Sequence, residues 1–199
     1  MASVSSLHAL TSGLAQYLTR AYQLRSINGV SCKFEPAGVS DIKKLDGQDV
    51  KLTLLLYRLT HNEHLRNRPP QTLPAGKPVP LTVDAHLLVT VWADTALKEQ
   101  SLLVWAMREL HMRPVLDRSL FADIGAYGSA DLVPLLPEEL SLDDMTKLWQ
   151  VLAPPMRPSL GYVARNVMVD LEPEPDRAPV LATRFEMHDP VAEVAEGFR

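Results

Sequence analysis

The run Leu81–Trp92 constrains the fold more than any other part of the sequence. Its odd-numbered residues are all aliphatic and alternate with mostly polar or bulky ones, and this period of two predicts a long β-strand. A second alternating run, Lys51–Leu59, predicts another strand with leucines on one face. Between the two runs, residues 61–80 contain five prolines, which oppose both a helix and a central strand. The chain is therefore expected to build a sheet around two strands joined by a long irregular connection.

Three segments have the periodicity of amphipathic helices. Ser3–Arg25 repeats apolar residues at spacings of three and four. A second helix is predicted from a cap at Asp94 or Thr95 to about Met112, where Pro114 follows. A third begins with a capping-box-like pattern at Ser141 and stops before Pro154 and Pro155. The buried stripe of the second helix is predicted to be Leu103, Ala106, Met107 and Leu110, and that of the third Leu142, Met145, Leu148, Trp149 and Leu152.

Shorter strands complete the expected sheet. They are Val30–Glu35, Asp131–Leu136 (broken by Pro137), Leu160–Leu171 and Val180–Met187, of which the last two are expected to form a hairpin. The predicted fold class is α+β or α/β, with a small mixed, mostly antiparallel sheet. An N-terminal helix and two further helices flank it, and a β-hairpin ends it. Residues 1–188 are expected to form a single domain, and 189–199 a flexible acidic tail.

Composition and charge narrow the possible classes of protein. With 46% hydrophobic and 22% charged residues, the chain has the composition of a globular domain. The single cysteine, Cys32, cannot form an internal disulfide, and neither a signal-peptide pattern nor a membrane-spanning run is visible. The net charge of −4 argues against a general nucleic-acid binder. It is concentrated in residues 170–199, which hold eight acidic residues against three arginines.

Catalytic spacings are missing from the sequence. It has no phosphate-binding glycine loop, nucleophile elbow or HExxH motif, and we expect neither catalytic residues nor a cofactor. One alternative stays open. His61 and His64, together with Asp84 and His86 on the next strand, have ligand types that zinc prefers, as in a small metal-dependent hydrolase. In the other reading, His61 and His64 are hydrogen-bonding loop residues, and Asp84 and His86 are a half-exposed pair on the strand.

Arginine and histidine gather around the start of the proline-rich connection. Without interleaved aromatics this cluster does not indicate RNA binding, whereas arginine is favoured at protein interfaces. An acidic turn near residue 174 offers a complementary face. The candidate contacts with other subunits are Arg58, His61, Asn62, His64, Arg66 and Arg68 on the basic side, and Glu172, Glu174 and Asp176 on the acidic side.

Four ordered blocks of sequence resemble a known family. The blocks begin at Tyr57 (YRLTHNEHLRNRPP), Pro80 (PLTVDAHLLVTVWA), Leu135 (LLPEELSLDDMTKLW) and Arg157 (RPSLGYVAR). Together they resemble the N-terminal domain of cap, or tail-terminator, proteins of extracellular contractile injection systems of the antifeeding-prophage and Photorhabdus-virulence-cassette type. The resemblance covers roughly residues 5–188.

This resemblance implies a structural role. Such caps form a six-fold ring that closes the baseplate-distal end of the inner tube and sheath, stops polymerisation and fixes particle length. The implied partners are further copies of the chain, sheath and inner-tube subunits, with no nucleic acid and no membrane. The implied location is cytoplasmic synthesis and assembly, followed by release in an extracellular particle. A baseplate adaptor or another tail component is the alternative. The predicted ribbon from Leu160 to Met187 is a further candidate for strand pairing with sheath subunits.

Overall fold

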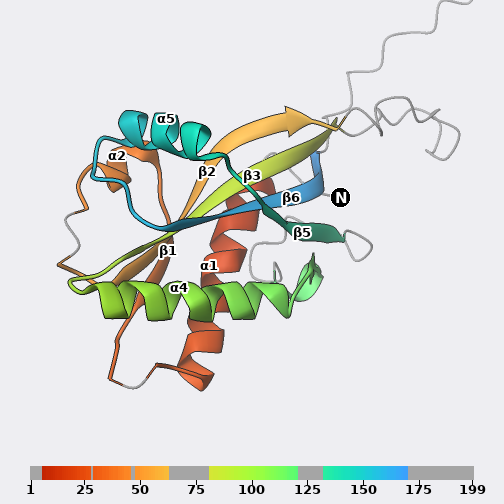
Figure 1. Cartoon of the computed structure of the whole chain (residues 1–199). Coiled ribbons are helices and arrows are strands. Elements are labelled where there is room, and N and C mark those ends of the chain that lie inside the picture. The colour runs from red at the N-terminus through yellow and green to blue at the C-terminus, as the bar shows by residue number, and fades with distance from the viewer. Residues whose placement is uncertain (1–5, 28, 46–47, 63–80, 121–131, 170–199) are drawn as a thin grey trace, which may run out of the picture.

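The computed structural model describes residues 6–27, 29–45, 48–62, 81–120 and 132–169. Helices cover both faces of one sheet, with α1 and α4 on one side and α2 and α5 on the other (Figure 1). In chain order the elements are α1 (Ser6–Leu24), β1 (Lys33–Pro36), α2 (Val39–Ile42), β2 (Lys51–His61), β3 (Leu81–Trp92), α4 (Ala96–His111), β4 (Val115–Leu116), the 3-10 helix η1 (Arg118–Leu120), β5 (Val133–Glu138), α5 (Leu142–Leu152) and β6 (Ser159–Val169).

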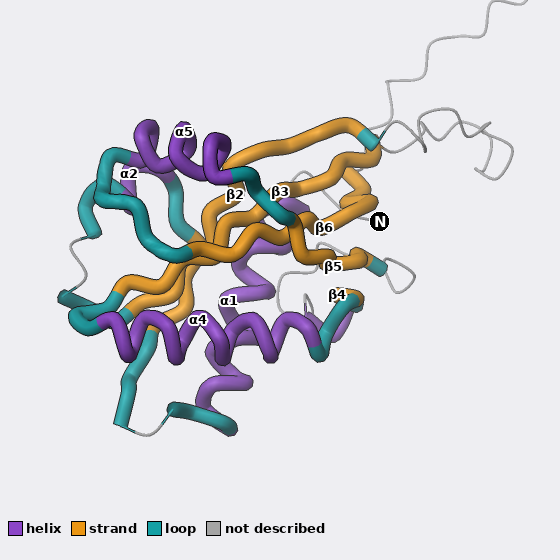
Figure 2. Tube along the Cα trace, in the orientation of Figure 1, coloured by secondary structure: helices purple, strands orange, loops and turns teal. Residues whose placement is uncertain are grey.

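Within the described residues the sheet has six strands in the order β1-β2-β3-β6-β5-β4, and Figure 2 shows the strands in orange. Only the short edge strand β1 is parallel to its neighbour, β2, and the other pairs are antiparallel. The predicted fold class, a small mixed and mostly antiparallel sheet with flanking helices, is confirmed. Neither the one-turn α2 nor the two-residue β4 is visible in the sequence pattern.

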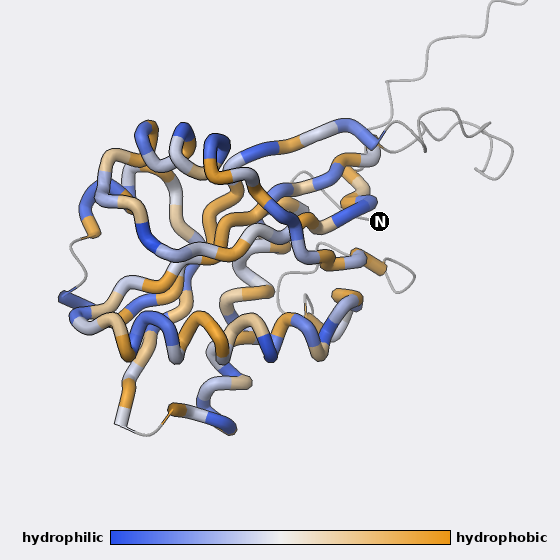
Figure 3. Tube along the Cα trace, in the orientation of Figure 1, coloured by the Kyte–Doolittle hydropathy of each residue, from blue (hydrophilic) through white to orange (hydrophobic). Residues whose placement is uncertain are grey.

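Both faces of the central strands are buried, in two separate hydrophobic clusters. Leu87, Val89 and Val91 of β3 contact α1 and α4, whereas Leu88 and Trp92 face α2 and α5. The hydropathy colouring shows orange running through the central strands between the two helical layers (Figure 3). The alternation in Leu81–Trp92 therefore separates two cores, and the burial of both faces stabilises the strand at the centre of the sheet.

Two predicted core residues are wrong, one on each outer helix. In α4 the buried apolar residues are Leu102, Trp105, Ala106 and Leu110, while Met107 is 44% exposed. In α5 the predicted stripe holds for Trp149 and Leu152, but Leu142 is 74% exposed because it begins the helix. Periodicity identified both helices but misjudged the limits of their buried faces. The pattern of apolar residues does not determine how much of the helix circumference is in contact with the sheet.

Pro137 does not break its strand, contrary to the sequence prediction. β5 continues to Glu138, and Pro137 pairs with Tyr162 of β6. The amide of Leu135 points outward and donates to the carbonyl of Pro114. Pro137, two residues later, turns its nitrogen the same way, beyond the end of β4. Its missing donor therefore costs no ladder hydrogen bond, as is usual for proline at a sheet edge.

The structure places β6 inside the sheet. It pairs with β3 along one side and with β5 over Gly161–Ala164 on the other. Its predicted hairpin partner, Val180–Met187, and the predicted tail lie outside the described residues. Over Gly161–Ala164 β6 therefore has no free edge for a sheath strand, which removes these four residues from the hypothesis that the Leu160–Met187 ribbon pairs with sheath subunits. No helix in the described part of the chain is long and apolar enough to cross a membrane.

Candidate functional site

The candidate contact region lies at one end of the sheet. β2 ends there at His61, β3 begins at Leu81 and β6 ends at Val169, and both the 63–80 connection and the chain beyond 169 leave from this end (Figure 1). Of the predicted contacts, Arg58 and His61 are exposed and Asn62 is half-buried. The others, His64, Arg66, Arg68, Glu172, Glu174 and Asp176, lie outside the described residues.

Asn62 holds the strand ends together. Its amide nitrogen donates to Asp84 at 3.2 Å and to the side-chain oxygen of Asn166 at 2.8 Å. Asp84 also accepts from the backbone N–H of Asn166 at 2.9 Å. Asn166 has a φ of 60°, at a bulge where β6 has one residue more than β3. The side chain of Asn62 thus already has internal partners, so its first role is to fix where the connection leaves the sheet.

A second polar cluster crosses three strands. His86 of β3 lies 2.8 Å from the Glu138 carboxylate through Nδ1 and 2.9 Å from the Thr60 hydroxyl through Nε2. Tyr57 donates its hydroxyl to the same carboxylate at 2.9 Å. Burial, and then the hydrogen bond to Glu138, raise the pKa of Tyr57. Because the Thr60 hydroxyl can donate or accept, either protonation state of His86 keeps both hydrogen bonds.

The predicted metal set does not come together among the described residues. Asp84 and His86 share one face of β3, as predicted, but Asp84 is engaged with Asn62 and His86 with Glu138. His61 pairs with Val83, whose side chain is buried in the cluster on the α1 and α4 side. His61 therefore faces away from Asp84 and His86. No group of three possible ligands able to hold a metal ion occurs in the described ranges, and His64 lies outside them.

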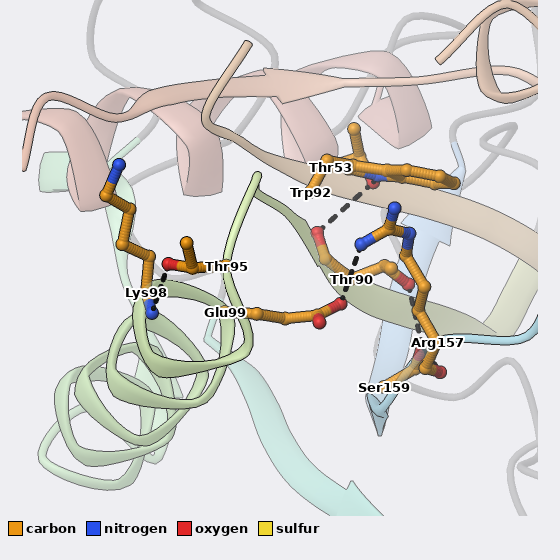
Figure 4. Close-up of polar contacts among 8 residues, drawn as sticks. All are labelled: Thr53, Thr90, Trp92, Thr95, Lys98, Glu99, Arg157 and Ser159. Atoms are coloured by element: carbon orange, nitrogen blue, oxygen red, sulfur yellow. Dashed lines mark hydrogen bonds and ion pairs between the residues drawn. The ribbon is translucent and has the colours of Figure 1, made fainter. Parts of the chain in front are cut away.

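A third network joins the sequence blocks that begin at Pro80 and at Arg157 (Figure 4). The Arg157 guanidinium lies over the Trp92 ring and donates to Glu99 of α4 at 3.1 Å. The Trp92 indole N–H donates to Thr53 at 2.9 Å, and Thr53 donates to the Thr90 carbonyl. The Thr90 hydroxyl in turn lies 2.9 Å from that of Ser159. Sequence reasoning missed this network, because its hydrogen-bonded pairs lie 37 to 69 positions apart and no motif links them.

Gly161 allows β5 to approach β6 closely. A Cβ atom at Gly161 would lie 2.5 Å from the backbone oxygen of Glu138, which no side chain tolerates. This glycine therefore sets the position of Glu138, whose carboxylate binds His86 and Tyr57. The block beginning at Arg157 is thus explained by internal packing, with its arginine, serine and glycine each holding a neighbouring element.

Comparison with known proteins gives the class of protein that this fold defines. Residues 8–183 match the Pvc16 N-terminal domain family, and the chain belongs to that family. None of the curated proteins matches it. The solved structures that share the fold include two terminators of such particles.

The first is the sheath/tube terminator of the PVC extracellular contractile injection system in its extended state. It is 19% identical, with a TM-score of 0.51, over 89% of this chain and 62% of that one. The second is the tube-terminating cap of the anti-feeding prophage, 21% identical with a TM-score of 0.50, over 86% of this chain and 59% of that one. The chain thus spans about three fifths of each terminator.

Proposed function

We propose that this chain is a structural cap of a phage-tail-like contractile injection particle. It closes the baseplate-distal end of the inner tube and sheath, stops their polymerisation and fixes particle length. The observation that carries the proposal is its membership of the Pvc16 N-terminal domain family together with the fold it shares with two tube terminators. We further propose that it acts as a six-fold ring of identical copies, assembled in the cytoplasm and then released as part of the particle.

The proposed role is non-catalytic. Asp84, His86 and Glu138, the acid–base side chains clustered at the sheet end, are each engaged with neighbouring side chains or backbone. Internal hydrogen bonds of this kind rigidify a scaffold, which supports a structural role for these side chains. Scaffold rigidity suits a ring that must hold the end of a polymer.

Particle length tests the cap role. Deleting the gene from a cluster that produces particles should give tubes and sheaths of uncontrolled, mostly greater length in negative-stain micrographs. Re-expression of the full chain should restore one narrow length distribution, while a chain truncated before β6 should not. Particles of normal, uniform length without the chain would contradict the cap role. Missing baseplates at normal tube length would instead favour the baseplate adaptor.

We propose that the basic segment from Arg58 to Arg68 and the acidic turn from Glu172 to Asp176 contact neighbouring subunits. The support is the place of Arg58 and His61, both exposed at the sheet end from which the connection leaves. Reversing Arg66 and Arg68 to glutamate should weaken incorporation of the cap into particles, and replacing both with lysine should weaken it less. Normal incorporation and normal length in the glutamate variant would contradict this assignment.

A further inference from the structure

Three arginines line a pocket between the C-terminal ends of α1 and α4, which pack on the same side of the sheet (Figure 1). The pocket has a volume of about 540 Å³. Arg20 and Arg25 reach it from the end of α1, and Arg113 from just beyond α4. Among the described residues that line it, the only carboxylate is the buried Glu109, which Arg25 contacts at 3.5 Å. With three arginines against one carboxylate, this lining has a net charge of +2, and we call it the arginine pocket.

Arg113 is the member of the pocket that most needs an anion. It is half-buried, and its guanidinium lies over the Tyr17 ring at 5.1 Å from the ring centre. No carboxylate forms an ion pair with Arg113 in the part of the chain that the structure describes. Stacking covers the flat face of the guanidinium and leaves N–H groups at its edge, which is where carboxylates bind. A partly buried cation without an anion is costly, so a carboxylate that reaches Arg113 is stabilised there.

Apolar side chains form the rest of the pocket rim. Leu24 and Met112 line the pocket and are 84% and 51% exposed. The occupant that fits therefore carries apolar groups as well as carboxylates. A small inorganic anion would leave the apolar rim uncovered. A nucleic acid would bring phosphates against leucine and methionine, and Arg113 already covers the Tyr17 ring on which a base would stack.

The chain itself contains a segment with this chemistry. Residues 186–199 hold four carboxylates against one arginine, a net charge of −3, and apolar residues are interleaved with the acidic ones. The segment lies outside the described residues and beyond residues 8–183, which match the family. It is therefore not part of the domain shared with the family. Its carboxylates are Glu186, Asp189, Glu193 and Glu196, and its apolar residues include Met187, Val191, Val194 and Phe198.

We propose that residues 186–199 dock in the arginine pocket of their own copy, with carboxylates on the arginines and apolar side chains over the rim. The 16 residues from 170 to 185 connect the segment to β6. Fully extended, they span about 50 Å, whereas a domain of this size is roughly 40 Å across. The tether also gives the segment a local concentration of about 1 mM, so at micromolar protein it fills its own pocket before that of another copy. This inference does not depend on the cap role.

Engineered cysteines test the contact directly. The variant Met112→Cys/Val194→Cys, made in a Cys32→Ala background, places one thiol at the pocket rim and one in the segment. Leu97→Cys/Val194→Cys is the matched control, because Leu97 is 77% exposed near the other end of the same helix, about 22 Å away. In purified protein at about 1 μM, the Met112 pair should form an intramolecular disulfide about tenfold faster than the Leu97 pair, or more. Non-reducing gels and mass spectrometry of the linked peptides measure both rates.

Charge reversal in the pocket shows whether the arginines cause the difference. Adding Arg25→Glu/Arg113→Glu should bring the two disulfide rates within about twofold of each other, because the segment then meets like charges. Equal rates without this change would overturn the docking, and so would a rate difference that survives it. Disulfide-linked dimers between a Met112→Cys copy and a Val194→Cys copy would place the segment on a neighbouring copy and overturn the own-copy assignment. Each of these contrary results leaves the cap role intact.

Amide NMR spectra give a second readout that needs no thiols. Replacing the four carboxylates of the segment with glutamine should shift the signals of the pocket rim and leave those of α5 unchanged. Millimolar phosphate should then shift the rim signals in the glutamine variant and much less in the parent protein, where the segment occupies the arginines. An equal response of both proteins to phosphate, or unchanged rim signals in the glutamine variant, would overturn the proposal. The rim signals are those of Leu24, Arg25, Met112 and Arg113.

Discussion

The guanidinium carbon of Arg157 lies 5.1 Å from the centre of the Trp92 ring, and the same group forms an ion pair with Glu99. The contact ties the segment that enters β6 to the end of β3 and to the first turns of α4. Trp92 and Arg157 both belong to the sequence blocks by which the chain resembles tail terminators. At least part of that signature therefore stabilises the fold, and its presence alone does not indicate a binding surface.

Replacing Arg157 with alanine should destabilise the fold by about 2–4 kcal/mol. The change removes a stacked cation and leaves the Glu99 carboxylate, whose side chain is 12% exposed, without its partner. Urea unfolding followed by tryptophan fluorescence measures the loss. Arg113 also stacks on a ring, that of Tyr17, and Arg113→Ala should cost about 1 kcal/mol or less. Equal effects of the two substitutions would contradict a special role for the Glu99 pair.

The sequence predicts the elements of this fold better than their contacts. Alternation identified β2 and β3, and helical spacing identified α1, α4 and α5, because each of these patterns repeats within a single segment. The Arg157, Trp92 and Glu99 contact depends on three segments meeting in space. No local pattern contains that information, so the sequence leaves the arginine as one more exposed charge.

Replacing Gly161 with alanine should destabilise the protein by about 2–4 kcal/mol. The new Cβ would lie 2.5 Å from the Glu138 backbone oxygen, so β5 must move away from β6. Gly38→Ala is the matched control, since its Cβ meets only the Asp41 carboxylate at 3.4 Å. Gly29 has a φ of 74° and open space around it, so Gly29→Ala should cost about 1 kcal/mol from backbone strain alone. Thermal unfolding should rank the three variants in the order Gly161, Gly29, Gly38.

Stability should fall in alkali partly because of Tyr57. Burial and the Glu138 hydrogen bond raise the pKa of this phenol in the folded state above its ordinary value near 10. Below pH 10 the phenol is protonated in both states, so its contribution is fully present. As the pH rises above 10, the Tyr57 phenol ionises first in the unfolded state. Its contribution to the free energy of unfolding is then lost progressively until the pH reaches the pKa of the folded state. Urea unfolding between pH 8 and pH 11 should show this decline.

The Tyr57→Phe variant separates ionisation from packing. It should be less stable than the parent protein at pH 8 by about 1–2 kcal/mol, because Glu138 loses a donor. Its stability should then fall less steeply between pH 10 and pH 11. Tyr162, whose pKa burial alone raises, serves as the comparison in Tyr162→Phe, which leaves the Glu138 network intact. Parallel curves for Tyr57→Phe and the parent protein would remove Tyr57 from the explanation.

The candidate contact surfaces are the least predictable part of the molecule from its sequence. Met107 and Leu142 have the spacing of core residues, and the structure leaves both exposed. Periodicity describes which residues are apolar on a helix, but packing angle and helix ends decide which of them reach the sheet. The structure describes three of the predicted contacts. Arg58 and His61 are exposed, whereas the Asn62 side chain is hydrogen-bonded within the domain to Asp84 and Asn166.

Cys32 should be almost unreactive in the folded protein, as expected for a structural thiol. Burial raises its pKa from about 9 to about 12, so about a thousandfold less thiolate is present at pH 8 than for an ordinary cysteine. Alkylation by iodoacetamide, followed by mass spectrometry, should therefore be slow at pH 8 and should accelerate tenfold per pH unit up to pH 11. Unfolding in urea should restore the rate of a free thiol. Fast alkylation at pH 8 without unfolding would show that residues 30–35 open to solvent in the folded protein.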